Sequence, residues 1–139
     1  MIIKEIMTKK VEAVAPETTL YEVARKFKEF EIGTLPVEEK GKVIGLITDR
    51  DLVTRGIADG WDFKQKHARD IMTKDIVFCY DDQELSDVAH LFEEKKLYRL
   101  PVMDHGGKMV GMFSVSDLAQ HASYELTGEV MHAVSRHTH

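Results

Sequence analysis

The chain has 139 residues, of which 43% are hydrophobic, and carries a formal net charge of −5 at pH 7. A chain of this length and composition can form one compact module with a sizeable core, and its acidic balance argues against a nucleic-acid backbone as partner. No apolar run approaches the roughly 20 residues of a membrane helix, and the first residues lack a secretory signal, so we expect a soluble, cytoplasmic protein.

The first predicted elements are a strand and a helix. Residues 11–14 are predicted to be a short strand that leads into a loop. Thr19 then caps a helix, because apolar residues recur after it at helical spacing and Glu22 stands three residues later. Gly33 is expected to end this helix.

Two strands and a second helix complete the first half. Residues 35–37 and 42–48 are predicted to be paired strands with a turn at Gly41 between them. A second helix is expected to begin near Arg50. The predicted order is therefore strand, helix, strand, strand, helix.

The same order returns in the second half of the chain. Residues 4–8 return at 69–73, and residues 45–51 return at 111–117. Over the wider alignment of the two halves, about a third of the positions are identical. Such self-similarity indicates two copies of one β-α-β-β-α unit.

The boundaries follow from this repeat. Trp61 and Phe63 lie between the copies and are expected to pin the connecting chain to the surface of the fold. The apolar spacing near the C-terminus permits a long or broken helix, with Gly128 as its weak point. The predicted divisions are repeat 1 over 1–58, a linker over 59–68, repeat 2 over 69–122 and a C-terminal extension over 123–139.

The cysteine and histidine residues do not indicate a disulfide bond or a metal site. Cys79 is the single cysteine, and its place in a predicted core strand indicates a buried, inert thiol. His121 and His132 are eleven residues apart, and His137 with His139 has no carboxylate or cysteine partner nearby in the sequence. We therefore expect no metal site.

Four features present in both halves carry a resemblance to a known family. They are an Ile-Met-Thr segment, a Leu-Pro-Val strand, a glycine-led hydrophobic strand end and a Thr/Ser-x-x-Asp sequence, at matching spacing in each copy. On these motifs the chain resembles a tandem CBS pair, named after cystathionine beta-synthase, from Lys4 to about Leu118. It is most similar to short, free-standing bacterial CBS-pair proteins, which also carry Thr-Asp-Arg-Asp in the first copy.

The resemblance implies an α+β fold in which two repeats pack sheet to sheet around a pseudo-twofold axis and leave two clefts. It also implies homodimers formed through helices. The ligands that it implies are adenosine compounds: AMP, ADP, ATP, NAD species or S-adenosylmethionine. Some members of the family show no ligand.

Thr48 and Asp51 stand where a predicted strand ends and a helix begins. A hydroxyl and the positive end of a helix favour phosphate there, and a carboxylate can accept both hydroxyls of a ribose. Ser114 and Asp117 repeat the arrangement. In the resembled family the Thr/Ser contacts phosphate and the Asp contacts ribose, and these roles carry over to the four residues. The alternative for each pair is a helix cap that needs no ligand.

Basic residues distinguish the two copies. Arg99 precedes the second Leu-Pro-Val strand, where the resembled family often has a phosphate ligand, and its first-copy counterpart is Thr34. Arg50 has Ser116 as its counterpart. We therefore predict two inequivalent sites, of which one binds with useful affinity. For either arginine the alternative is a solvated surface charge.

The segments that end in Thr8 and Thr73 are candidates to contact an adenine through their backbone. The side chains of Met7 and Met72, and of the isoleucines before them, are instead predicted to pack in the core.

Together these features predict a regulatory module that binds an adenine nucleotide or a related adenosyl ligand and thereby changes what it presents to a protein partner. The alternative is a constitutive dimeric interaction protein that binds no ligand. The sequence has no nucleophile pattern, P-loop or dinucleotide Gly-x-Gly-x-x-Gly run. We therefore expect no enzymatic activity and no required cofactor.

Overall fold

The computed structural model describes residues 1–9 and 12–136 and divides the chain into two compact units. One is continuous in sequence and comprises Glu12–Ile76. The other joins Met1–Val11 to Val77–His139 and is called the discontinuous unit below. Each unit has its own hydrophobic core, and the predicted α+β class is confirmed.

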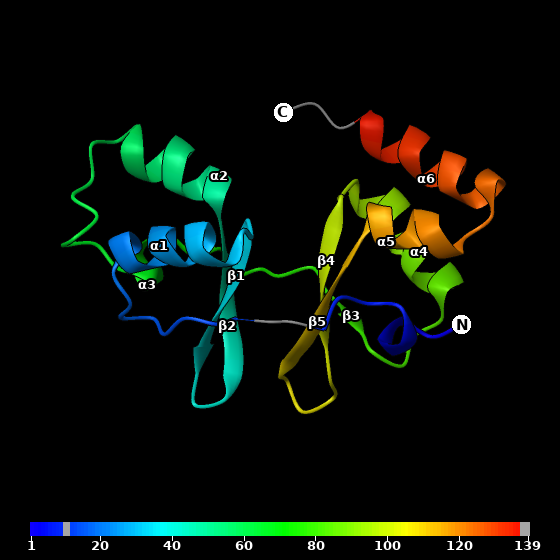
Figure 1. Ribbon diagram of the computed structural model, residues 1–139, viewed down its shortest axis with the longest axis horizontal. Helices are drawn as coiled ribbons and strands as arrows, with labels where there is room; N and C mark the ends of the chain where they lie inside the picture. The colour runs from blue at the N-terminus through cyan, green and yellow to red at the C-terminus, as the bar shows by residue number, and fades with distance from the viewer. Residues whose placement is uncertain (10–11, 137–139) are drawn as a thin grey trace. The chain divides into compact units, whose positions relative to one another are not determined.

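The continuous unit consists of a two-stranded antiparallel sheet and helices that pack on it (Figure 1). The strands pair in register from Thr34 opposite Thr48 to Val37 opposite Gly45, after which the register shifts. Its elements are α1 (Leu20–Phe30), β1 (Thr34–Glu39), β2 (Lys42–Thr48), α2 (Asp49–Asp51), the π-helical η2 (Leu52–Ile57) and α3 (Ala68–Ile71).

Helix α1 begins as the sequence predicts but ends earlier. The Thr19 hydroxyl accepts a hydrogen bond from the Glu22 N–H at 3.2 Å, which is the predicted N-cap. The helix stops at Phe30 because Glu31 adopts the left-handed conformation with φ 53°. The prediction that Gly33 ends this helix was therefore wrong, since Glu31 takes the left-handed cap position itself.

The discontinuous unit has a three-stranded sheet in the order β3-β4-β5 (Figure 1). Strand β3 is parallel to β4, and β4 is antiparallel to β5. Its elements are the 3-10 turn η1 (Ile3–Glu5), β3 (Cys79–Tyr80), α4 (Leu85–Lys95), β4 (Arg99–Met103), β5 (Met109–Ser114), α5 (Val115–His121) and α6 (Tyr124–Ser135).

The first predicted strand is reduced to one pairing. Val14 forms an isolated parallel bridge with Val37, whereas in the second repeat the matching position, Cys79, begins the regular strand β3. Val11, at the start of the predicted strand, lies outside the described residues.

The C-terminal extension forms a separate helix. Helix α5 ends at His121, Ala122 is extended, and the Ser123 hydroxyl accepts the Leu126 N–H at 3.1 Å to cap α6. Gly128 lies inside α6, so the break falls before the predicted weak point. Figure 1 shows α6 beside α4 and α5, which it covers with the buried Val130.

The chain between the repeats packs against the continuous unit, as predicted. Trp61 and Phe63 contact the core of that unit, and the Lys66 ammonium lies 5.1 Å from the Trp61 ring centroid. The Phe63 ring faces Gly56, where an added Cβ would come within 2.7 Å of its Cε1. The connecting chain is thus a packed part of the unit.

Candidate functional site

In the continuous unit, Thr48 and Asp51 form a reciprocal pair at the junction of β2 and α2. The Asp51 N–H donates to Thr48 Oγ1 at 3.1 Å, and the Thr48 N–H donates to Asp51 Oδ2 at 2.9 Å. This is a capping box, and it requires both side chains to point at the turn. The Asp51 side chain is 19% exposed, so its carboxylate remains accessible while its orientation is fixed.

The discontinuous unit contains the same turn between β5 and α5. The Asp117 N–H donates to Ser114 Oγ at 3.1 Å, and the Ser114 N–H donates to Asp117 Oδ2 at 2.9 Å. The Ser114 hydroxyl also donates to Asp117 Oδ2, at 3.0 Å. The capping arrangement is therefore present in both repeats, and in each it leaves carboxylate Oδ1 free of hydrogen bonds among the described residues.

The segments that carry Thr8 and Thr73 are exchanged between the repeats. Thr73 and Leu46 exchange backbone hydrogen bonds at 2.9 and 3.0 Å, so the second repeat's segment lies beside strand β2 of the first. Thr8 and Met112 likewise exchange two bonds of 2.9 Å, which places the first repeat's segment beside β5 of the second. Each candidate site therefore combines residues of both sequence repeats.

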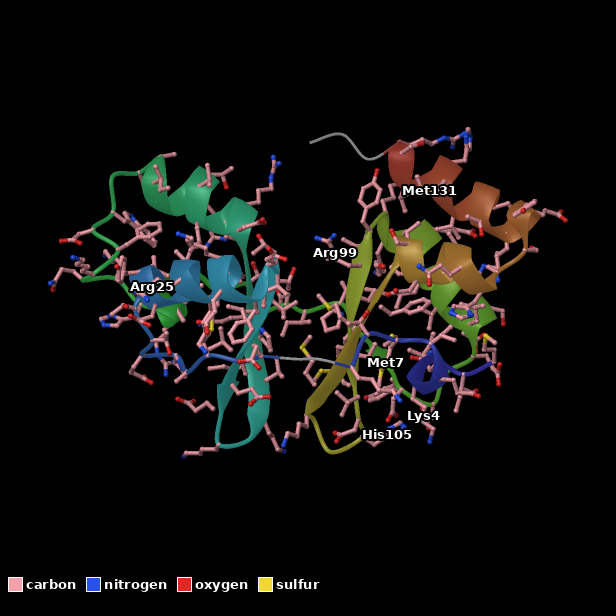
Figure 2. All side chains as sticks on the ribbon, in the orientation of Figure 1. Lys4, Met7, Arg25, Arg99, His105 and Met131 are labelled. Atoms are coloured by element: carbon pink, nitrogen blue, oxygen red, sulfur yellow. The ribbon has the colours of Figure 1, made fainter. Side chains whose placement is uncertain are left out.

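This pairing changes what these segments can offer a ligand. The N–H and C=O groups of Thr8 and Thr73 are used by the adjoining strands, while both side chains are exposed. Ile71 and Met72 are buried, and Ile6 and Met7 pack against the core, as predicted for these side chains. Figure 2 shows Met7 beside the strands of the discontinuous unit.

A glycine in each strand admits the methionine of the exchanged segment. A Cβ built on Gly45 would lie 2.7 Å from Met72 Sδ, and one built on Gly111 would lie 2.5 Å from Met7 Sδ and 2.8 Å from the Thr8 carbonyl oxygen. No side chain larger than hydrogen fits there without displacement. The glycine that opens each repeated strand motif thus has a packing role.

The basic residues near the two turns differ between the repeats. Arg99 is exposed and pairs in register with Ser114, and its side chain extends from β4 (Figure 2). Directly paired residues of antiparallel strands point to the same face, so Arg99 shares a face with the Ser114 hydroxyl. The residue opposite Thr48 is the neutral Thr34. Arg50 is exposed on α2 of the first repeat.

Arg55 also reaches the first-repeat site, and the sequence interpretation did not include it. Its Nη2 donates to the Ile71 carbonyl at 2.6 Å, and its Nη1 lies 3.7 Å from Asp51 Oδ1. A spacing of four residues on one helix makes contact with Asp51 predictable. No local signal in the sequence shows that Arg55 would also reach Ile71.

Cys79 lies in the hydrophobic core rather than at either of the two turns. It is fully buried in the core of the discontinuous unit, and burial raises the pKa of its thiol to about 12. Among residues 1–9 and 12–136, no group of three or more His, Cys, Asp or Glu side chains is arranged to hold a metal ion. Within the same residues, no helix is long and apolar enough to cross a membrane.

The chain belongs to the CBS domain family. The family's domain model matches twice, over residues 3–57 and 68–124. The chain is therefore a tandem CBS-domain pair.

Relatives and solved structures agree with this assignment. The chain is 32% identical over 134 residues to the CBS domain-containing protein YhcV of Bacillus subtilis, covering 96% of this chain and 94% of that protein. It is 34% identical over 121 residues to the uncharacterized protein MK0525 of Methanopyrus kandleri, but spans only 62% of that protein's length. The crystal structure of CBSX2 in complex with AMP matches with 26% identity and a TM-score of 0.71, covering 86% of this chain and 93% of that chain.

Proposed function

We propose that the protein is a regulatory module without catalytic activity of its own, which senses an adenine nucleotide or a related adenosyl ligand of the AMP, ADP, ATP, NAD or S-adenosylmethionine class. The observation that carries this proposal is the duplicated turn in which a hydroxyl residue and an aspartate end a strand and begin a helix. Support comes from CBSX2, a protein of the same family whose crystal structure contains AMP.

The roles proposed for the four turn residues follow from their hydrogen bonds. Asp51 and Asp117 each commit Oδ2 to the turn and keep Oδ1 to accept ribose hydroxyls. The Thr48 hydroxyl accepts a bond within the turn and retains its own proton to donate to phosphate. The Ser114 hydroxyl donates to Asp117 and must rotate to do the same.

The two sites are proposed to bind with unequal affinity. The second-repeat site has Arg99 opposite its serine, whereas the first has Arg50 on the helix that follows its threonine. An arginine offers phosphate several N–H donors in a fixed plane. Thr8 and Thr73 border the second-repeat and first-repeat sites respectively, and their exposed side chains are candidates for contact with the base.

A thermal-shift panel with AMP, ADP, ATP, NAD, NADH and S-adenosylmethionine tests the proposal. A ligand present at about 100 times its Kd stabilises a protein by about 2.7 kcal/mol, so at least one compound should raise Tm by several degrees. Asp51→Ala and Asp117→Ala should identify the responsible site by abolishing its response. Thr19→Ala removes a cap remote from both turns in sequence and serves as the control, since it should lower Tm but preserve the ligand shift.

The opposite result would favour the ligand-free alternative. If no adenosyl compound shifts Tm, and both aspartate variants merely cost about 0.5 to 1 kcal/mol of cap stability, the turns are caps only. The protein would then act as a constitutive interaction module.

We propose further that the protein is a homodimer formed through helices. Val53 and Ile57 lie four residues apart in η2 and are 56% and 61% exposed. They therefore share one helical face, and the exposure of its apolar side chains to water is unfavourable. Light scattering should give twice the chain mass for the wild type. The double variant Val53→Glu and Ile57→Glu should give the mass of one chain, and an unchanged dimer would exclude this face.

A further inference from the structure

Arg55 connects two parts of the first-repeat site that are distant in sequence. Its Nη2 donates to the Ile71 carbonyl at 2.6 Å, while its Nη1 lies 3.7 Å from Asp51 Oδ1. A guanidinium holds its donors in a rigid plane, so it can keep a carboxylate and a carbonyl at a fixed separation. We propose that Arg55 is a positioning residue, which aligns the Asp51 carboxylate with the segment Ile71–Thr73 and on which ligand affinity at this site depends.

The two carboxylate oxygens of Asp51 have different partners. Oδ2 accepts the Thr48 N–H at 2.9 Å, which fixes the carboxylate to the turn. Oδ1, the oxygen left for a ribose hydroxyl, is the one that faces Arg55. Arg55 therefore acts on the atom to which the proposed function assigns ribose binding, and the inference rests on that proposed function.

The contact with Ile71 reaches the other side of the site. Ile71 is fully buried, and its carbonyl precedes Met72 and Thr73, which lie beside strand β2. A hydrogen bond from a charged donor at 2.6 Å is short and strong. This bond holds the segment in place from the helix side, while the ladder between Thr73 and Leu46 holds it from the strand side.

Local structure accounts for the position of Arg55. The helix that starts at Asp49 continues as π-helical η2, in which the Ala58 N–H donates to the Val53 carbonyl at 3.1 Å. Gly56, next to Arg55, lies against the Phe63 ring with no room for a Cβ. The backbone that carries Arg55 is thus packed on the unit, although the Arg55 side chain itself is 46% exposed.

Among the described residues of the second repeat, no hydrogen bond or ion pair is equivalent to this connection. Four residues after Asp117 stands His121, which occupies the position that Arg55 has after Asp51. An imidazole is shorter than a guanidinium and has no planar fork with which to donate to a carbonyl while it faces a carboxylate. The dependence on residue 55 is therefore specific to the first-repeat site, and His121 provides a matched control.

Isothermal titration with AMP tests the inference in the Asp117→Ala background, where binding at the second-repeat site is removed. Arg55→Ala should weaken the remaining binding by about tenfold or more. Arg55→Lys should stay weakened because an ammonium keeps the charge but not the fork. His121→Ala should leave the affinity unchanged.

Amide hydrogen exchange provides a readout that does not need a ligand. Arg55→Ala should speed exchange at the Thr73 N–H, which bonds to Leu46, and leave the equivalent Thr8 N–H, which bonds to Met112, unchanged. Equal protection of Thr73 in both proteins would show that Arg55 does not hold the segment.

The other outcomes separate this inference from the proposed function. If Arg55→Ala lowers Tm but leaves AMP affinity within about twofold, or if Arg55→Lys restores full affinity, Arg55 does not position the site. If the wild type binds AMP but the Asp117→Ala variant does not, the inference falls and the proposed function stands. If the wild type binds no adenosyl compound, both fall.

Discussion

Replacing Gly111 by alanine should destabilise the discontinuous unit strongly for so small a change. The new Cβ would lie 2.5 Å from Met7 Sδ and 2.8 Å from the Thr8 carbonyl oxygen. The sulfur can swing away because the methionine side chain is flexible. The carbonyl cannot move freely, because it accepts the Met112 N–H at 2.9 Å as part of the pairing with β5.

The expected cost combines two terms. Overpacking a well-filled site costs about 1 to 3 kcal/mol. Weakening the pair of hydrogen bonds between Thr8 and Met112 adds about 0.5 to 1.5 kcal/mol for each bond that is lost. We therefore expect Gly111→Ala to lower the free energy of unfolding by about 2 to 4 kcal/mol, which corresponds to a fall in Tm of roughly 6 to 12 °C for a chain of this size.

Urea unfolding of three variants measures this effect. Gly128→Ala is the control, because Gly128 lies in a helix and an added Cβ would meet nothing within 4 Å beyond the adjoining helix backbone. This variant should gain about 0.5 to 1 kcal/mol. Adding Met7→Ala removes the contact with Sδ but leaves a gap beside the core, and the Thr8 carbonyl still blocks the new methyl group, so the double variant should remain destabilised. A loss below about 0.5 kcal/mol for Gly111→Ala would refute this account of the exchanged segment.

Three further predictions concern other parts of the fold. Burial raises the pKa of the Cys79 thiol to about 12 from 9.0, so the contribution of the thiol to stability is complete below about pH 9 and is lost as the pH rises toward 12. Urea titrations at pH 8 and 10.5 should therefore show a smaller fall in the free energy of unfolding for Cys79→Val than for the wild type. The hydrogen bond from His105 lowers the pKa of the Asp82 carboxyl, so its stabilising effect is present above about pH 3.8 and lost below, and His105→Ala should raise that pKa in a carboxyl NMR titration. Gly56→Ala should lower the free energy of unfolding by about 1 to 3 kcal/mol in thermal unfolding, because the new Cβ collides with the Phe63 ring. Adding Phe63→Leu should recover part of this stability. An undiminished loss in the double variant would show that the collision is not the cause.

Local sequence patterns predicted those features of the site that are determined within a few residues. A hydroxyl residue followed three positions later by aspartate specifies a capping box, and both Thr48–Asp51 and Ser114–Asp117 form one. The burial of Cys79 likewise followed from its place in an apolar strand. The cap uses Oδ2 of each aspartate, and the ligand contact proposed above would use Oδ1.

The exchange of the leading segments could not be predicted in this way. Aligning the repeats assigns Thr8 to the first copy, but its backbone partner is Met112, more than one hundred residues away. Hydrogen-bond partners at such separation leave no periodic signal in either segment. The contact between Arg55 and Ile71 could not be predicted for the same reason, although the four-residue spacing of Arg55 from Asp51 is visible in the sequence.

The division into a continuous and a discontinuous unit has a consequence for synthesis on the ribosome. All residues of the continuous unit have been made once Ile76 is in place, so its core can close while the rest of the chain is still being translated. The discontinuous unit needs Ile3 to meet Phe92, Phe113 and Val134 in one core. Ile3 can therefore complete this core only after Val134 has been made, and its contact closes a long loop of chain that contains the continuous unit.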